Sequence, residues 1–130
     1  MKILQPPGWT APRGYVNGIA ARGNFVMVAG QIGWNANCIF DSDDFAAQAA
    51  QALQNIVAVL NEAGAKPEHV VRMTWYITDR EKYLTAAKAL GAEYRRLFGR
   101  HFPTMTAIVV TALIEPRALV EIEATAIVPD

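Results

Sequence analysis

The sequence has no excess charge, one cysteine and no long hydrophobic run, and each shortage excludes a class of protein. Twelve basic and twelve acidic side chains cancel, which argues against a nucleic acid or acidic membrane held by bulk electrostatics. The single Cys38 cannot form an internal disulfide, so an oxidised secreted scaffold is excluded. No stretch approaches the ~18–20 apolar residues of a membrane span, and the first residues lack a signal peptide's apolar run. We expect a cytoplasmic protein.

Apolar residues are in slight excess. They make up 52% of the 130 residues, and charged residues make up 18%, against the usual ~45–50% and ~25%. This composition excludes disorder, which requires low hydrophobicity and high net charge. The length predicts a single domain over residues 1–130. The chain is nevertheless more apolar and less charged than we expect of a soluble monomer.

Hydrophobic periodicity predicts seven elements. Short apolar runs at 15–21 and 24–31, separated by Arg22 and Gly23, fit a β-hairpin. A helix opens after Asp41 or Ser42 as the capping residue and ends before Gly64. The remaining elements are a strand at 70–78, a helix at 80–98, and strands at 104–113 and 119–128. The order β-β-α-β-α-β-β predicts an α+β fold with both helices on one face of the sheet.

The second face of this sheet is expected to be apolar as well. Strict alternation in the strand 70–78 places Met73 and Trp75 on one face and Val70 on the other. The strand 104–113 also carries apolar residues on both faces. Two helices cover only one face, and a bare apolar face would exceed what a soluble monomer exposes. We therefore expect a homo-oligomer.

Four segments together resemble the RidA/YjgF family, also called endoribonuclease L-PSP. They are GYVNG at 14–18, VAGQI at 28–32, the pair Phe102-Pro103, and VEIEA at 120–124. The resemblance covers nearly the whole chain. It implies a chorismate-mutase-like (ferredoxin-like) fold and a homotrimer around a central barrel, with ligand clefts at the subunit interfaces. It also implies hydrolysis of imines and enamines to 2-oxo acids and ammonia, without a cofactor.

Three positions depart from the family's pattern. The family carries an arginine two residues after the Phe-Pro pair, where a guanidinium grips the substrate carboxylate; this sequence has Met105. Ala29 stands where the family has a serine, and Gly91 aligns with its asparagine. The resemblance thus predicts a RidA-like deaminase acting on a substrate other than the usual 2-iminopropionate class. Arg13 or Arg117 is a candidate replacement for the missing arginine.

Glu121 is the candidate catalytic residue, as the carboxylate that orients water or moves protons. It shares a strand face with Glu123, while Val120, Ile122 and Ala124 lie on the other. The alternative is that both carboxylates belong to a solvated polar face. Tyr15 is expected to present its hydroxyl to the ligand, or else to pack on the sheet edge.

Four further residues complete the predicted substrate site. Met105 and Ala107 would line an apolar cleft, and Trp34 would cap it by stacking. The simpler expectation for Trp34 is structural packing, and for Gln31 it is a hydrogen bond that holds a local turn.

Other chemistries find little support. His69 and His101 lack metal-ligand spacing, so no metal is predicted. The basic cluster at 95–101 is an argument for RNA binding or cleavage. The balanced charge and the absence of interleaved aromatic platforms argue against it. A non-catalytic trimer that binds a ligand or another protein remains the main alternative to an enzyme.

Overall fold

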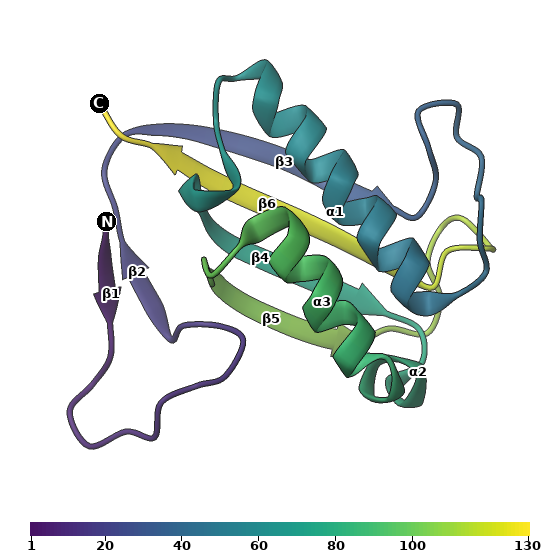
Figure 1. Cartoon of the computed structure of the whole chain (residues 1–130), viewed down its shortest axis with the longest axis horizontal. Coiled ribbons are helices and arrows are strands. Elements are labelled where there is room, and N and C mark those ends of the chain that lie inside the picture. Colours follow the sequence, from purple (N-terminus) through teal and green to yellow (C-terminus); the bar gives the residue numbers. More distant parts are fainter.

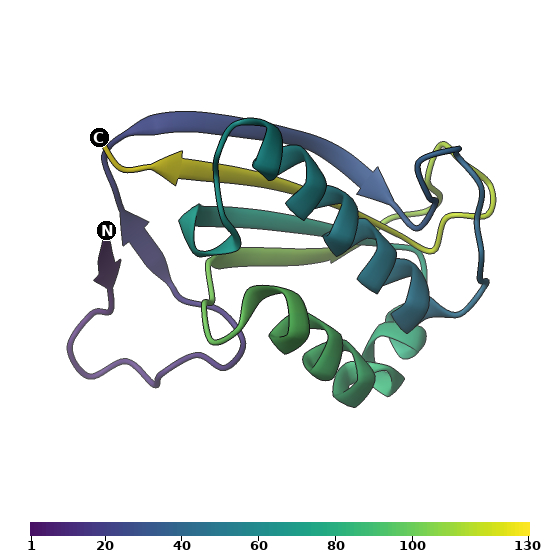
Figure 2. The same ribbon diagram turned by 45° about the horizontal axis from the view of Figure 1, so that its top comes forward.

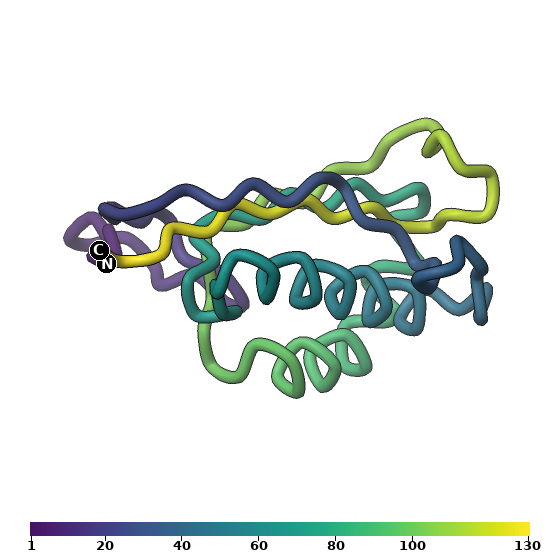
Figure 3. Tube along the Cα trace, turned by 90° about the horizontal axis from the view of Figure 1, so that it is seen from above, coloured from purple at the N-terminus to yellow at the C-terminus, as the bar shows by residue number.

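The computed structural model describes all 130 residues and shows one four-stranded sheet with helices on one face. The strand order is β3-β6-β4-β5, formed by Asn24–Ile32, Val120–Val128, Val70–Ile77 and Thr104–Val109. β6 pairs antiparallel with both neighbours, whereas β4 and β5 run parallel (Figure 1). Viewed along the sheet, the helices lie below it and no element covers the opposite face (Figure 3). The predicted α+β fold is confirmed.

Helix α1 (Phe45–Glu62) supplies much of the core. Ala49, Ala52, Leu53, Ile56 and Leu60 are fully buried, because they recur at steps of three and four residues. The N-cap is Asp44, whose carboxylate accepts a hydrogen bond from the backbone N–H of Ala47 at 3.0 Å. The predicted cap at Asp41 or Ser42 was wrong, since the Ser42 hydroxyl instead accepts from the backbone N–H of Asp44. The helix ends at Ala63, and Gly64 has φ +67° as predicted.

The second predicted helix is two helices. α2 (Arg80–Thr85) and α3 (Ala87–Phe98) meet at Ala86, where ψ is −1° and the chain turns (Figure 2). Neither proline nor glycine marks this break, so periodicity could not find it. A single 3₁₀ turn, η1 (Pro67–His69), leads into β4. None of the helices combines the length and the apolar character that a membrane span requires.

The predicted hairpin is wrong. β2 (Gly18–Ala20) pairs with β1 (Lys2–Leu4) in a separate two-stranded sheet beside the main one, and β3 pairs with β6 (Figure 1). The physical reason lies at Gly23, which has φ +147° and whose missing side chain lets the backbone pass against Val128. The chain therefore turns a corner there and continues along β6 rather than folding back on β2.

The uncovered face is less apolar than strict alternation predicts. A register shift between Val70 and Arg72 places Val70 in the core together with Met73. The middle of the uncovered face then carries polar side chains: Arg72, Thr74, Tyr76, Glu121, Glu123 and Thr125. Exposed apolar side chains lie at its two edges, Phe25 and Met27 on β3 and Ile108 on β5.

Candidate functional site

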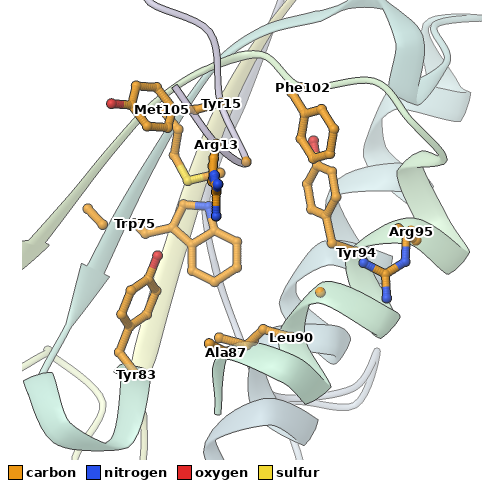
Figure 4. A pocket seen from close by; sticks show the side chains of 13 residues that line it. Arg13, Tyr15, Trp75, Tyr83, Ala87, Leu90, Tyr94, Arg95, Phe102 and Met105 are labelled. Atoms are coloured by element: carbon orange, nitrogen blue, oxygen red, sulfur yellow. The ribbon is translucent and has the colours of Figure 1, made fainter. Parts of the chain in front are cut away.

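The largest cavity lies at the β5 edge of the sheet, on the side of the helices. It measures about 530 Å³ and is lined by α2 and α3, by β4 and β5, and by the segment that precedes β2 (Figure 4). Four of the predicted site residues line it: Tyr15, Gly91, Met105 and Ala107. They come from three distant parts of the sequence, so folding brings together much of the predicted substrate site.

The segment before β2 is held in place by main-chain contacts. The backbone N–H of Val16 donates to the carbonyl of Pro103 at 3.1 Å, and Val16 forms a parallel bridge with Thr104. Gly14 has φ +79°, which favours glycine at this turn. Tyr15 is thereby fixed beside the strand that carries Met105, which places both side chains in the same cavity wall.

Aromatic rings form most of the remaining wall. Tyr94 stacks on Phe102 with ring centroids 5.6 Å apart, and its hydroxyl donates to the carbonyl of His101 at 2.7 Å. Burial raises the pKa of Tyr94, so this phenol stays a neutral donor. On the other side, Trp75 and Tyr83 meet edge to face at 6.2 Å. The cavity therefore presents flat apolar surfaces to a ligand.

The charged residues of the cavity wall are both basic. Arg13 comes from the segment before β2, and Arg95 lies one helical turn after Gly91. Neither arginine forms a salt bridge or donates a side-chain hydrogen bond, and no acidic side chain lines the cavity. A methyl group at Gly91 would lie 3.3 Å from Arg95 Nη1, so the glycine leaves room for this guanidinium. The cavity suits an anionic ligand with an apolar body.

Glu121 lies away from this cavity, on the uncovered face and toward the opposite edge of the sheet. Its carboxylate covers Gly30 so closely that a side chain at that position would collide with it. Gln31 donates to the carbonyl of Ala29 at 3.1 Å, which is the local role expected for it. Ala29, Gln31 and Glu121 thus form a second cluster, where β3 shifts register against β6.

The neighbouring carboxylate is already engaged. Glu123 accepts a hydrogen bond from the Tyr76 hydroxyl at 2.7 Å, and this bond is the main reason that the pKa of Tyr76 is raised. Glu121 has no such partner on its own chain. Of the two carboxylates on this face, Glu121 is therefore the one that is free to contact a ligand or water.

Trp34 and Arg117 belong to a separate small cluster. The Trp34 ring lies 5.9 Å from Phe40, and its carbonyl accepts from the Asn55 amide at 2.8 Å. Arg117 lies over Phe40 and pairs with Asp43 at 2.8 Å, so its guanidinium is already engaged. Arg13, and not Arg117, therefore reaches the cavity that contains Met105.

Residues 8–128 match the family described as Endoribonuclease L-PSP. The chain belongs to the RidA/YjgF family. A RutC family protein of Synechocystis sp. is 33% identical over 135 residues, covering 99% of this chain and 98% of that protein. The 2-iminobutanoate/2-iminopropanoate deaminase of Escherichia coli is 33% identical over 117 residues, covering 87% and 86%. The structure of the Rid-family protein YyfB from Yersinia pestis superposes with a TM-score of 0.85, at 31% identity and 98% coverage of both chains.

Sequence reasoning missed several cavity residues of this RidA/YjgF chain. Trp75 lies in the middle of a strand, where alternation predicts only a core residue, although it also lines the cavity. Tyr83, Tyr94 and Arg95 lie on helices, and periodicity does not show where a helix stands off from the sheet. The spacing of Arg95 four residues after Gly91 was the one available signal, since residues i and i+4 share a helix face.

Proposed function

We propose that this RidA/YjgF protein is a homotrimeric hydrolase that releases ammonia from a small imine or enamine, in clefts between subunits. The related deaminase of Escherichia coli supports the reaction type. The observation that carries the proposal is the separation of two clusters on one chain. Tyr15 and Met105 lie at the β5 edge, whereas Glu121 and Gly30 lie on the uncovered face toward the β3 edge.

A ring of subunits would join these clusters. The two edges of the sheet differ, and each exposes apolar side chains: Phe25 and Met27 on one, Ile108 and Val109 on the other. Contact between unlike edges is head-to-tail, and such contacts form a closed ring when the rotation between neighbouring subunits closes. In a trimer of this kind, Glu121 of one subunit would face the cavity of the next.

The chemistry needs a positioned water and a group that moves protons. Water adds to the carbon of the C=N bond, the nitrogen gains a proton, and the resulting carbinolamine expels ammonia as its hydroxyl becomes a carbonyl. Glu121 would accept a proton from the attacking water and return it to the leaving nitrogen. Tyr15 would contact the substrate, and Met105 would form an apolar wall. Because methionine donates no hydrogen bond, we expect a substrate class other than 2-iminopropionate.

The test measures ammonia release from enzymatically generated imines, with 2-aminoacrylate as the usual substrate and the imine of leucine as a larger one. We expect faster release from the larger imine and a loss of about 100-fold or more in Glu121→Gln. Glu123→Gln is the matched control, since it lies on the same strand face and should keep its activity. Full activity on 2-aminoacrylate that Met105→Ala leaves unchanged would refute the shift in substrate class. Equal losses in the two glutamate variants would refute the role of Glu121.

A non-catalytic ligand-binding or protein-interaction trimer is the second candidate. It is favoured by the absence of any acidic side chain in the cavity wall, which leaves the cavity of a single chain without a proton-transfer carboxylate. Native mass spectrometry of the purified protein distinguishes the two. A retained small molecule together with no turnover of any imine would support the binding protein.

A further inference from the structure

Gly91 forms a notch between two basic side chains on the face of α3 that borders the cavity. Lys88 precedes it by three residues and Arg95 follows it by four, so the three positions share one helix face. Gly91 and Arg95 both line the cavity. A methyl group at Gly91 would lie only 3.3 Å from Arg95 Nη1, so this guanidinium lies beside the bare helix surface that the glycine leaves. The notch therefore gives a ligand room next to Arg95.

No acidic side chain neutralises this end of the cavity. Arg95 forms no salt bridge, and the one acidic residue of α3, Glu93, pairs with Arg96 at 2.7 Å. Arg13, the other charged residue of the cavity wall, is also basic and stands well apart from Arg95 in Figure 4. A single carboxylate would balance only one of these two separated charges. The charge pattern of the wall is therefore complementary to a ligand with two acidic groups.

An acidic side chain on the substrate would supply the second group. A 2-imino acid keeps the side chain of the amino acid from which it forms, and aspartate and glutamate are the amino acids whose side chains end in a carboxylate. A planar guanidinium binds such a group through two parallel N–H···O bonds. The cavity of about 530 Å³ lies within the usual range for small-molecule sites, roughly 300–1,000 Å³, so it has room for either imine.

We propose that Arg95 is a specificity-determining residue that binds the side-chain carboxylate of an acidic 2-imino acid, the imine of glutamate or aspartate. The inference rests on the proposed imine hydrolysis for its reaction, and it concerns the end of the substrate that is remote from the C=N bond. Gly91 leaves the space in which this carboxylate lies. Lys88 adds positive charge on the same helix face.

Binding is measured by isothermal titration calorimetry on the intact protein, with 2-oxoglutarate as the stable 2-oxo acid of glutamate. The comparison ligand is 5-methyl-2-oxohexanoate, in which a branched methyl end of similar shape replaces the second carboxylate. We expect 2-oxoglutarate to bind at least about fivefold more tightly than this singly charged acid. Added salt should weaken the binding of 2-oxoglutarate more than that of the comparison acid, because the contact with Arg95 is ionic and exposed.

Arg95→Gln should weaken 2-oxoglutarate binding by roughly fivefold to tenfold, between the values for an exposed ion pair and for a hydrogen bond to a buried charged group. It should leave the binding of 5-methyl-2-oxohexanoate unchanged, which a general loss of folding would not do. Arg96→Gln is the matched control, since Arg96 is the exposed next residue of the same helix, pairs with Glu93 and does not line the cavity. Lys88→Gln should have a smaller effect than Arg95→Gln, in the same direction.

The proposal is overturned if 2-oxoglutarate binds no more tightly than the comparison acid, or does not bind at all. Unchanged affinity for 2-oxoglutarate in Arg95→Gln would also overturn it. So would a loss in Arg95→Gln that is equal for the two acids, or an equal loss of 2-oxoglutarate binding in Arg96→Gln.

Turnover separates this inference from the proposed function. Binding of 2-oxoglutarate that depends on Arg95, without ammonia release from any imine, would refute the hydrolase and leave the acid-binding role of Arg95 standing. Ammonia release from the imine of leucine that is faster than from the imine of glutamate, and equal in Arg95→Gln and the unmodified protein, would refute the role of Arg95 and leave the hydrolase standing.

Discussion

At Gly91, a side chain would stabilise the helix but would take up space in the cavity. Gly91 lies inside α3, where glycine is less favourable than alanine by roughly 0.5–1 kcal/mol. The added methyl group of Gly91→Ala would meet Arg95 Nη1 at 3.3 Å. That atom is the far end of an exposed, flexible side chain, so it can give way by a few tenths of an ångström. We therefore expect the free energy of unfolding to rise by about 0.5–1 kcal/mol.

Urea unfolding followed by circular dichroism checks this expectation, at one fixed protein concentration because oligomers gain stability by mass action. Ala92→Gly is the matched control, since Ala92 is the exposed next residue of the same helix and should lose a similar amount. The methyl group also takes space in the cavity wall, so Gly91→Ala should release ammonia from the larger imine more slowly although it is more stable. A fall in stability would show that the Cβ does not fit and would refute the reasoning.

Two further predictions concern buried polar groups. Gln48→Leu removes three hydrogen bonds to backbone groups, at 3.1, 3.1 and 2.9 Å, and should lower the free energy of unfolding by about 3 kcal/mol in urea, at about 1 kcal/mol each. The exposed control Gln54→Leu should change it by less than about 0.5 kcal/mol, and equal effects would contradict the argument. Because burial raises the pKa of Tyr94 above its ordinary value of 10.0, folding keeps this phenol protonated, so stability is fully present below that pH and falls as pH rises above it. Unfolding midpoints at pH 9 and 11 should differ less in Tyr94→Phe, and an unchanged difference would refute this cause.

The long elements of this fold could be predicted from the sequence because their periodicity is strong. Alternation in β6 correctly separates Glu121 and Glu123 from the buried Val120 and Ile122. The pairing of the short strands could not be predicted, since three residues carry no readable alternation and the position of β3 is decided by close backbone packing at Gly23. The β-bulge next to Val70 likewise depends on register against β6.

The candidate site was predictable where its residues follow a strand or a motif. Met105 and Ala107 lie two residues apart on β5, so they share a face and enter the cavity together. The helix-borne residues, Tyr94 and Arg95, were not predictable as site residues. Their place in the cavity depends on the distance between α3 and the sheet, which is set by packing rather than by any local pattern.

Arg13 and Met105 line the same cavity from two different parts of the fold. Residue 105 and Arg13 are far apart in sequence, yet the hydrogen bond from Val16 to Pro103 joins the two segments that carry them. Because that contact is made by main-chain atoms, it is independent of which side chain stands at 105. The arrangement therefore keeps Arg13 beside the cavity whichever residue stands at 105, and the two side chains enter the cavity from different walls.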